Sequence, residues 1–440
     1  MDLIIAFVIF IAAMIASLIG GWPMVLPLMV GFVCFFAVGR HRGFPSRNLV
    51  RMAWAGGRDS LVVVEVLVLI GLISALWRSA GTITFFVYYG IRVITPSLFI
   101  IITFLLACLL SYALGTSFGV AGTVGVIFMA LARSGDVNEI ITAGAVLSGV
   151  FFGDRGSPVS SSALLVAAVT KTNIFDNVRG MMKSVLLPLG LSILIYTILS
   201  VQNPIRTVDE SILRALETDF SISLWLVIPA ALMLILPLFR INVMICMAAS
   251  IVAAFLITVM VQGTPIMEAL RLSITGFSVK SDNLGNILSG GGVLSMLEVC
   301  AIVFISCSFS GIFSGAHLLR TIQDALERSI HRLGKFGAML LVSVGTTAIF
   351  CNQTIASIMC SDLMGKPYKN RGADAYELAI DIENSVIIIS PLIPWCIASS
   401  VPLSMLGVGM GAIPYAVLLY LVPLCYIFTK RIWFKSSSST

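Results

Sequence analysis

Charged residues are scarce in this sequence. Of its 440 residues, 11% are charged and 58% are hydrophobic, and the mean hydropathy is +1.05. Soluble globular proteins carry about 25% charged residues, because their surfaces must face water. So little charge excludes a soluble domain and indicates a protein that faces lipid over much of its surface.

Catalytic motifs and metal-ligand patterns are also lacking. The three histidines, His41, His317 and His331, lie in or next to loops, and neither a His-Glu-x-x-His nor a Gly-x-Ser-x-Gly motif is present. The nine cysteines lie in or beside apolar runs and include no Cys-x-x-Cys pair, which argues against disulfides and metal sites. We therefore expect no enzyme activity and no cofactor.

Long apolar runs are what the sequence does contain. They lie at 3–19, 22–38, 60–76, 184–201, 223–239, 241–261 and 412–428. A transmembrane helix needs about 20 apolar residues, whereas a barrel would show alternating segments of about ten. The sequence predicts an all-α polytopic membrane protein with about 10 to 12 spans. Whether 336–364 spans once or folds back at Cys351 to Gln353 stays open.

Basic residues gather in a few loops. The net charge is +6, and in a membrane protein such residues mark cytoplasmic loops rather than a nucleic-acid site. The loop 39–59 has five arginines against one aspartate, which predicts a cytoplasmic N-terminus. The loop 202–220 has two arginines against four acidic residues and is expected outside, whereas the basic residues after 428 predict a cytoplasmic C-terminus.

Several features recur at one spacing. The pairs, each 230 residues apart, are Gly81 and Gly311, Gly115 and Gly345, and Asp154 and Asn384. This spacing predicts two repeats, at 60–201 and 290–431. The rest would be two leading spans with a basic loop (1–59), a linker (202–289) holding a hairpin at 223–261, and a tail (432–440). The charges of corresponding loops differ, which predicts that the repeats have inverted topology.

Each predicted repeat is interrupted twice by polar residues. Backbone leaves helical geometry at membrane depth only where protein or water satisfies its N–H and C=O groups, so matched interruptions indicate discontinuous helices around a transport site. The first pair is GTSFGVAGTVG (115–125) and GTTAIFCNQT (345–354). Its candidate ligands are Thr116, Ser117, Thr346, Asn352 and Gln353. Helix packing by small residues is the alternative.

The second pair of interruptions carries charge, in GDRGSPVSSS (153–162) and IENSVIIISPLIPW (382–395). An ionised group at membrane depth costs about 2.5–3.5 kcal/mol, so Asp154 is predicted to bind a cation or a proton. Arg155 either pairs with Asp154 or meets an anionic substrate; alternatively the two form an ion pair that only stabilises the interruption. Glu383 and Asn384 lie at the matching place, and Asp154 with Glu383 forms a candidate sodium site. Further candidate ligands are Ser157, Ser160, Ser161, Ser385 and Ser390.

Two more acidic residues, Glu65 and Glu298, lie inside apolar runs, a few residues from their starts. Long side chains near a helix end can reach the membrane interface, which is one interpretation of both residues. A role in transport is the other.

These motifs resemble those of the NhaC sodium/proton antiporter family, within the larger ion transporter superfamily. The resemblance covers most of the chain and rests on IGLISALWRSAGTI (70–83), LGTSFGVAGTVGVIFMALA (114–132), SGVFFGDRGSPVSSS (148–162) and IENSVIIISPLIPW (382–395). It implies a secondary transporter of a bacterial plasma membrane that exchanges sodium for protons or couples such a gradient to organic anions.

The sequence departs from the family pattern at charged positions. Asp154, Arg155, Ser157, Pro158 and Ser160 agree in kind with the family's Asp-Lys-x-Ser-Pro-x-Ser. Ser161 and Ser162 then replace the usual Asp and Thr, and Asn384 replaces the Asp of a Glu-Asp-Ser-Gly pattern. Fewer carboxylates hold sodium less strongly and bind fewer protons.

The first functional hypothesis is therefore sodium/proton antiport by alternating access, with sodium and protons as coupling ions. Sodium- or proton-coupled transport of a small organic acid or amino acid is the alternative, and a channel is a remote one. The expected partners are the lipid bilayer, a small ion or solute and a second copy in a homodimer, with no nucleic acid.

Overall fold

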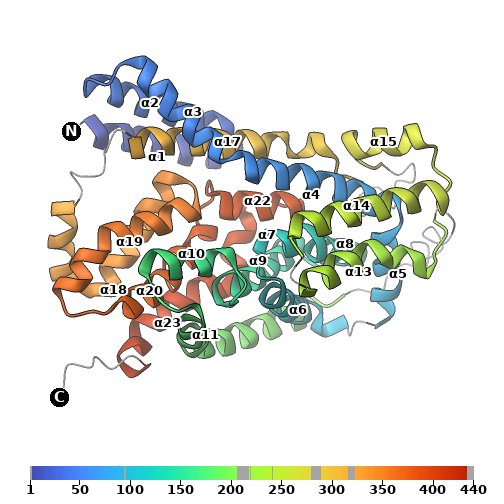
Figure 1. The fold of residues 1–440 in the computed structure, drawn as a ribbon. Coiled ribbons are helices and arrows are strands. Elements are labelled where there is room, and N and C mark those ends of the chain that lie inside the picture. The colour runs from blue at the N-terminus through green and yellow to red at the C-terminus, as the bar shows by residue number, and fades with distance from the viewer. Residues whose placement is uncertain are drawn as a thin grey trace.

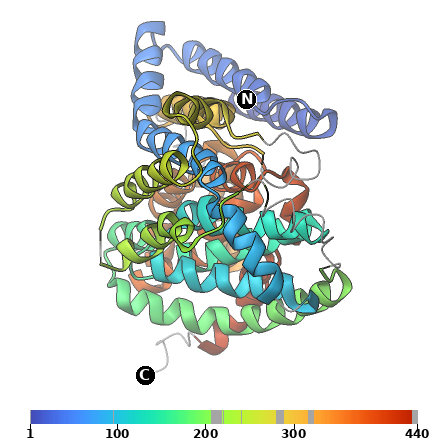
Figure 2. The same ribbon diagram turned by 90° about the vertical axis from the view of Figure 1, so that its right-hand side faces the viewer.

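The protein is described by a computed structural model over residues 2–93, 96–205, 218, 220–239, 241–278, 289–315 and 323–433. Within these ranges the regular elements are helices, with one isolated bridge between Phe277 and Gly290 (Figures 1 and 2). The predicted all-α membrane protein is confirmed at this level.

The helices of the first half of the chain fall into two groups. The first group is α1 (Asp2–Gly20), α2 (Val25–His41), α3 (Ser46–Asp59), α4 (Leu61–Ser79) and α5 (Thr82–Val93). The second is α6 (Phe99–Leu114), α7 (Ser117–Val120), α8 (Val126–Ser134), α9 (Glu139–Gly156), α10 (Ser161–Thr170) and α11 (Ile174–Gln202). A π-helical segment, Ala121–Gly125, joins α7 to α8.

The remaining helices form the middle and the end of the chain. The middle ones are α13 (Ile228–Ile235), α14 (Val243–Met260) and α15 (Ile266–Thr275). The last are α17 (Leu297–Gly315), α18 (Gln323–Phe350), α19 (Gln353–Asn370), α20 (Ala375–Glu383), α21 (Val386–Ile389), α22 (Ile397–Leu406) and α23 (Val417–Trp433).

By length and composition, four described segments can each cross a bilayer alone, and two bent helix pairs raise this to six. The bent pairs are Ser46–Arg58 with Val63–Ser79, and Ala375–Leu392 with Ile397–Leu406. Other apolar helices have 10–17 residues. The predicted 10 to 12 spans require most of these shorter helices to cross as well, so that number stays a prediction.

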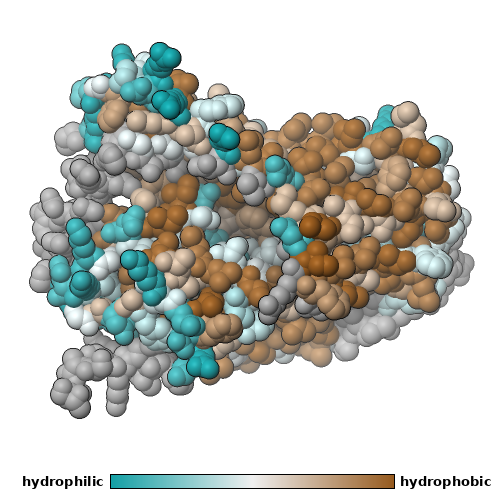
Figure 3. Space-filling view, viewed as in Figure 1, coloured by the Kyte–Doolittle hydropathy of each residue, from teal (hydrophilic) through white to brown (hydrophobic). Residues whose placement is uncertain are grey.

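The hydrophilic and hydrophobic residues of the surface lie in different parts of the molecule. Hydrophilic residues gather at the end where the N-terminus, α2 and α18 to α20 lie, and hydrophobic residues cover much of the rest of the visible face (Figures 1 and 3). The C-terminal end of α23 lies toward the same side as the N-terminus (Figure 1). This arrangement suits a bundle whose apolar part is surrounded by lipid.

Helices α6 and α9 pack closely at the centre. A Cβ atom on Gly153 would lie 2.0 Å from the carbonyl carbon of Ser111, so this approach requires glycine. Gly149 faces α6 in the same way, with a Cβ position 2.5 Å from that of Ala107. The two glycines hold the end of α9 against α6, and thereby fix where the charged interruption lies.

Helix ends match at a constant spacing in the two halves. Gly115 and Cys351 both have positive φ, 65° and 54°, and the N-caps that follow, Thr116 and Asn352, have φ of −143° and −138°. Their separation is 351 minus 115, or 236 residues. The same 236 separates the N-caps Ser160 and Cys396, and the C-caps Lys171 and Gly407, at φ 59° and 71°. Matching helix ends are thus offset by 236 residues, where the sequence motifs suggested 230.

The segment 336–364 is interrupted. Helix α18 ends at Phe350, Cys351 takes the left-handed conformation, and α19 begins at Gln353 and packs against α18. The side chain of Asn352 caps α19 by accepting from the backbone N–H groups of Thr354 and Ile355. Of the two interpretations of this segment, the structure supports the break at Cys351 to Gln353.

Candidate functional site

Asp154 lies in the last turn of α9, and its carboxylate is surrounded by neutral donors. Only 4% of the residue is exposed. Ser162 Oγ donates to Oδ2 at 2.9 Å, and Gln353 Nε2 donates to the same oxygen at 3.0 Å. Ser160 Oγ donates to the Asp154 carbonyl oxygen. Neutral donors stabilise a carboxylate without fixing a permanent counter-ion beside it, so the carboxylate is able to take a cation or a proton.

A cavity of about 140 Å³ opens beside Asp154. Its lining residues are Val63, Thr116, Ser117, Phe118, Asp154, Ser161, Ser162, Asn352, Gln353, Thr354, Ile397 and Ala398. A water molecule occupies roughly 30 Å³ in the liquid, so the cavity has room for about four or five waters, a partly hydrated ion or a small organic acid.

Four helices begin at this cavity. They are the span that starts with α7 and continues to Ser134, and α10, α19 and α22, whose first residues are Ser117, Ser161, Gln353 and Ile397. The N-terminus of a helix carries roughly half a positive charge, because its first N–H groups lack intrahelical partners. The four ends together stabilise negative charge in the cavity, including the ionised form of Asp154.

The lining has the 236-residue symmetry of the helix ends. Thr116, Ser117 and Phe118 correspond to Asn352, Gln353 and Thr354, and Ser161 and Ser162 correspond to Ile397 and Ala398. Asp154 breaks the symmetry, because its counterpart at this spacing is Ser390. Residues at this spacing therefore line the cavity together, and Asp154 is the one carboxylate among its lining residues.

Arg155 is completely buried but is held away from Asp154. Its Nη2 donates to Ser184 Oγ at 2.7 Å, to Asn384 Oδ1 at 2.5 Å and to the Met181 carbonyl at 3.1 Å. Nε and Nη1 have no hydrogen-bond partner among the described residues. These contacts hold Arg155 against α11 and α20, outside the lining of the cavity.

Glu383 is also completely buried, and neither carboxylate oxygen accepts a hydrogen bond from a described residue. It attracts Arg155 electrostatically, and it is repelled by Asp154. Asn384 joins α20 to α11, since Ser184 Oγ also donates to its Oδ1 at 3.2 Å. Glu383 is not among the lining residues of the cavity, so a sodium site shared with Asp154 stays a prediction.

The other predicted ligands divide into two groups. The first group lines the cavity with Asp154 and consists of Thr116, Ser117, Ser161, Asn352 and Gln353. Ser160, the N-cap of α10, donates to the Asp154 carbonyl oxygen. Thr346, Ser385 and Ser390 donate to helix carbonyls of Val342, Asp381 and Val386, and Ser157 is buried outside the lining. Glu65 and Glu298 are likewise absent from the lining.

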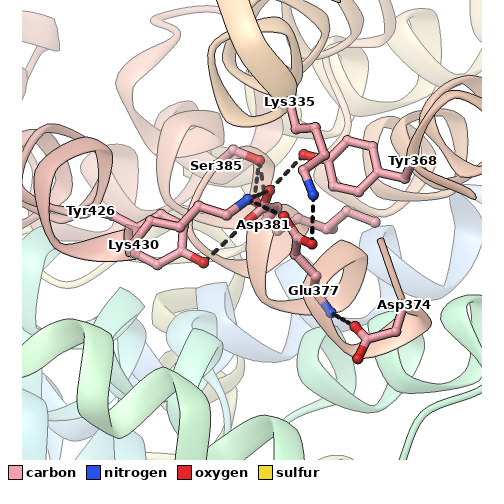
Figure 4. A network of polar contacts seen from close by, with 9 residues as sticks. Lys335, Tyr368, Asp374, Glu377, Asp381, Ser385, Tyr426 and Lys430 are labelled. Carbon is pink, nitrogen blue, oxygen red and sulfur yellow. Dashed lines mark hydrogen bonds and ion pairs between the residues drawn. The ribbon is translucent and has the colours of Figure 1, made fainter. Parts of the chain in front are cut away.

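A second polar network was not expected from the sequence (Figure 4). Asp381, completely buried on α20, accepts from Tyr368 at 2.6 Å and from Tyr426 at 2.9 Å, and it pairs with Lys430. Lys430 also pairs with Glu377 at 2.9 Å, and Lys335 pairs with Glu377 at 2.8 Å. The two acidic residues are four apart on one helix, and this spacing was the available signal.

The network ties four helices together. Asp381 and Glu377 are on α20, Tyr368 is on α19, and Tyr426 and Lys430 are on α23. Lys335 comes from α18, just after its kink at Gly334. Glu383 is the last residue of α20, and Asn384, which accepts from Arg155, is its C-cap. The network therefore fixes the position of the helix whose end binds Arg155.

Polar breaks, four converging helix ends and a buried carboxylate within an all-helical apolar bundle define a membrane transporter of the secondary type. The chain belongs to the Na+/H+ antiporter family, whose model matches residues 2–170 and 149–429. The resemblance seen in the sequence is thereby confirmed.

Relatives of the chain differ in what their names say they carry. The chain is 25% identical over 429 residues to the malate-2H(+)/Na(+)-lactate antiporter of Bacillus subtilis, covering 95% of this chain and 92% of that protein. It is 24% identical to the Na(+)/H(+) antiporter NhaC of Alkalihalophilus pseudofirmus, over 90% of this chain and 88% of the relative. It is 26% identical to the arginine/ornithine antiporter ArcD of Halobacterium salinarum, over 81% and 75%.

Proposed function

We propose that the protein exchanges sodium ions for protons across a plasma membrane, with Asp154 binding either the ion or the proton. The observation that carries this proposal is a buried carboxylate in a cavity whose other polar contacts to it are neutral. A sodium ion bound there would have Asp154 as its one charged ligand, with the hydroxyl oxygens of Ser117, Ser161 and Ser162 as neutral ones. No cofactor and no chemical conversion are needed.

The movement proposed is alternating access between two inverted repeats. The matched helix ends and the symmetric lining support two related halves that meet at the cavity. The loop 171–183 is basic and the corresponding loop 401–413 has no charge, and this difference supports their inversion, with both chain ends in the cytoplasm. In this proposal the interrupted helices are discontinuous spans, and each half exposes the cavity in turn to one side.

A small organic acid is the second candidate cargo. Each of the four helix N-termini carries roughly half a positive charge, so together they exceed the single negative charge of Asp154 and leave positive potential for a second anion. The cavity also has hydroxyl groups that could bind a solute's carboxylate or hydroxyl. The names of the relatives include both kinds of exchange. In this version sodium or protons drive the solute through the same cavity.

The test uses purified protein in liposomes that contain a pH-sensitive dye. An imposed sodium gradient should change the internal pH above the level of empty liposomes, and Asp154→Asn should abolish the change. Asp176→Asn is the matched control, because that carboxylate is 60% exposed and is not among the lining residues of the cavity. Wild-type exchange by Asp154→Asn would refute the role of Asp154.

The same liposomes separate the two cargoes. If sodium alone gives no pH change, labelled malate, lactate and arginine are added under sodium and proton gradients. Uptake that depends on a gradient and on Asp154 would establish the second candidate in place of the first.

A further inference from the structure

An apolar groove that shares no lining residue with the cavity lies between α2, α3 and α17. Its volume is about 360 Å³, and its lining residues include Met29, Phe32, Val33, Val50, Trp54 and Phe304. Several of these side chains are open on one side, since Trp54 is 65% exposed and Val33 is 64% exposed. A groove with apolar walls and an open side suits a hydrocarbon chain.

Arginines border this groove along α3. Arg47, Arg51, Trp54 and Arg58 follow one another at intervals of four, three and four residues. With 3.6 residues per turn, this spacing places all four on one face of the helix. The arginines therefore share a face with the tryptophan that lines the groove.

These arginines are exposed, and no described side chain forms an ion pair with Arg47, Arg51 or Arg58. The neighbouring Arg42 differs, because it pairs with Asp2 at 3.1 Å. Helix α3 is also the first part of a bent pair with α4, so it enters the apolar bundle from its hydrophilic end (Figures 1 and 3). Exposed arginines at a membrane boundary attract anionic head groups.

We infer that this groove binds an anionic phospholipid. One acyl chain lies in the groove against Trp54 and Phe304, and the phosphate group meets Arg47 and Arg51. The charge of the arginine face complements the phosphate, and the apolar walls complement the chain, so the two halves of the lipid match two adjacent surfaces. A zwitterionic lipid would fill the groove but would gain less from the arginines.

The experiment measures quenching of Trp54 fluorescence by brominated lipids in nanodiscs that contain the full-length protein. The Trp54 contribution is the difference between the wild type and Trp54→Phe. We expect brominated phosphatidylglycerol to quench this contribution at a several-fold lower mole fraction than brominated phosphatidylcholine. Each arginine near a membrane surface is worth about fivefold in lipid affinity, so Arg51→Gln should reduce the preference by about that factor.

Control variants separate this site from a general effect of charge. Arg179→Gln removes an arginine that is 80% exposed on α11, away from the groove, and should leave the preference unchanged. Arg47→Gln provides a second reading if Arg51→Gln does not fold. Equal quenching by both lipids, or equal loss in Arg179→Gln, would overturn the inference.

A second copy of the chain is the competing occupant. If neither lipid quenches Trp54 and native mass spectrometry shows a dimer that Trp54→Ala dissociates, the groove is a dimer interface and the inference is wrong. Quenching by phosphatidylglycerol that persists in the monomer supports the lipid.

Discussion

The side-chain amide of Gln353 donates to the carboxylate of Asp154 at 3.0 Å, although the two residues are 199 positions apart in the chain. Gln353 is the first residue of α19, and Asp154 lies at the end of α9. One hydrogen bond therefore links the interruption of one half directly to that of the other, at the cavity between them.

Replacing Gln353 by alanine should weaken ion binding without unfolding the protein. A hydrogen bond to a charged group contributes about 1.5–3 kcal/mol, so the sodium concentration for half-maximal exchange should rise by roughly tenfold or more. Sodium-dependent pH changes in liposomes measure this. Gln353→Glu adds a second carboxylate 3.0 Å from the first and should change the pH dependence of exchange as well. An unchanged sodium dependence in Gln353→Ala would show that this contact is not part of the ion site.

Arg155 and Glu383 should depend on each other for stability. Arg155→Gln removes the cation that attracts Glu383 and changes the group that donates to Ser184 and Asn384, so it should lower the free energy of unfolding. Adding Glu383→Gln removes the carboxyl group left without this cation and should restore part of the lost stability. Thermal unfolding in detergent measures both variants.

Exchange by the double variant then decides the role of the pair. Activity near that of the wild type would mean that Arg155 and Glu383 only stabilise α9 against α20. Loss of exchange in a stable double variant would mean that transport requires their charges.

Lys430 is expected to be a strong determinant of stability. Lys430→Met removes the cation shared by Asp381 and Glu377, and the completely buried Asp381 would keep only its two tyrosine donors. We expect a loss of about 3–5 kcal/mol, partly recovered in Lys430→Met with Asp381→Asn. Arg179→Ala, at an exposed pair, should change stability by less than about 1 kcal/mol. Equal melting temperatures for the Lys430 and Arg179 variants would contradict this expectation.

Two glycine-to-alanine changes should have opposite effects. A Cβ on Gly153 would lie 2.0 Å from Ser111, so Gly153→Ala must separate α6 from α9 and should lower both stability and exchange. Gly190 lies inside α11 with no atom within 4 Å of its Cβ position. Gly190→Ala should therefore stabilise the protein by about 0.5–1 kcal/mol. Melting temperatures that fall by the same amount in both variants would argue against close packing at Gly153.

The sequence predicted the helical membrane class, because long apolar runs leave few other structures possible. It also predicted Asp154, Thr116, Ser117, Asn352 and Gln353 as ligands, since polar residues inside such runs are costly and therefore conspicuous. The structure brings these five to one cavity.

Two aspects of the site were beyond the sequence. The spacing of 230 came from short glycine and polar motifs, whereas the 236 spacing depends on left-handed and capping backbone angles that residue type does not determine, as Cys351 shows. The direction in which a side chain points could not be predicted from the sequence either. Arg155 follows Asp154 directly, yet adjacent residues on a helix point about 100° apart, and Arg155 contacts α11 and α20 instead.

The single carboxylate of the cavity limits how the proposed exchange responds to voltage. In the proposed exchange Asp154 is the group that binds either ion, and its counterpart Ser390 is neutral, so one sodium ion would replace one proton in each cycle. Such a cycle moves no net charge across the membrane. The sodium and proton gradients alone would set its direction, and a membrane potential would neither drive it nor oppose it.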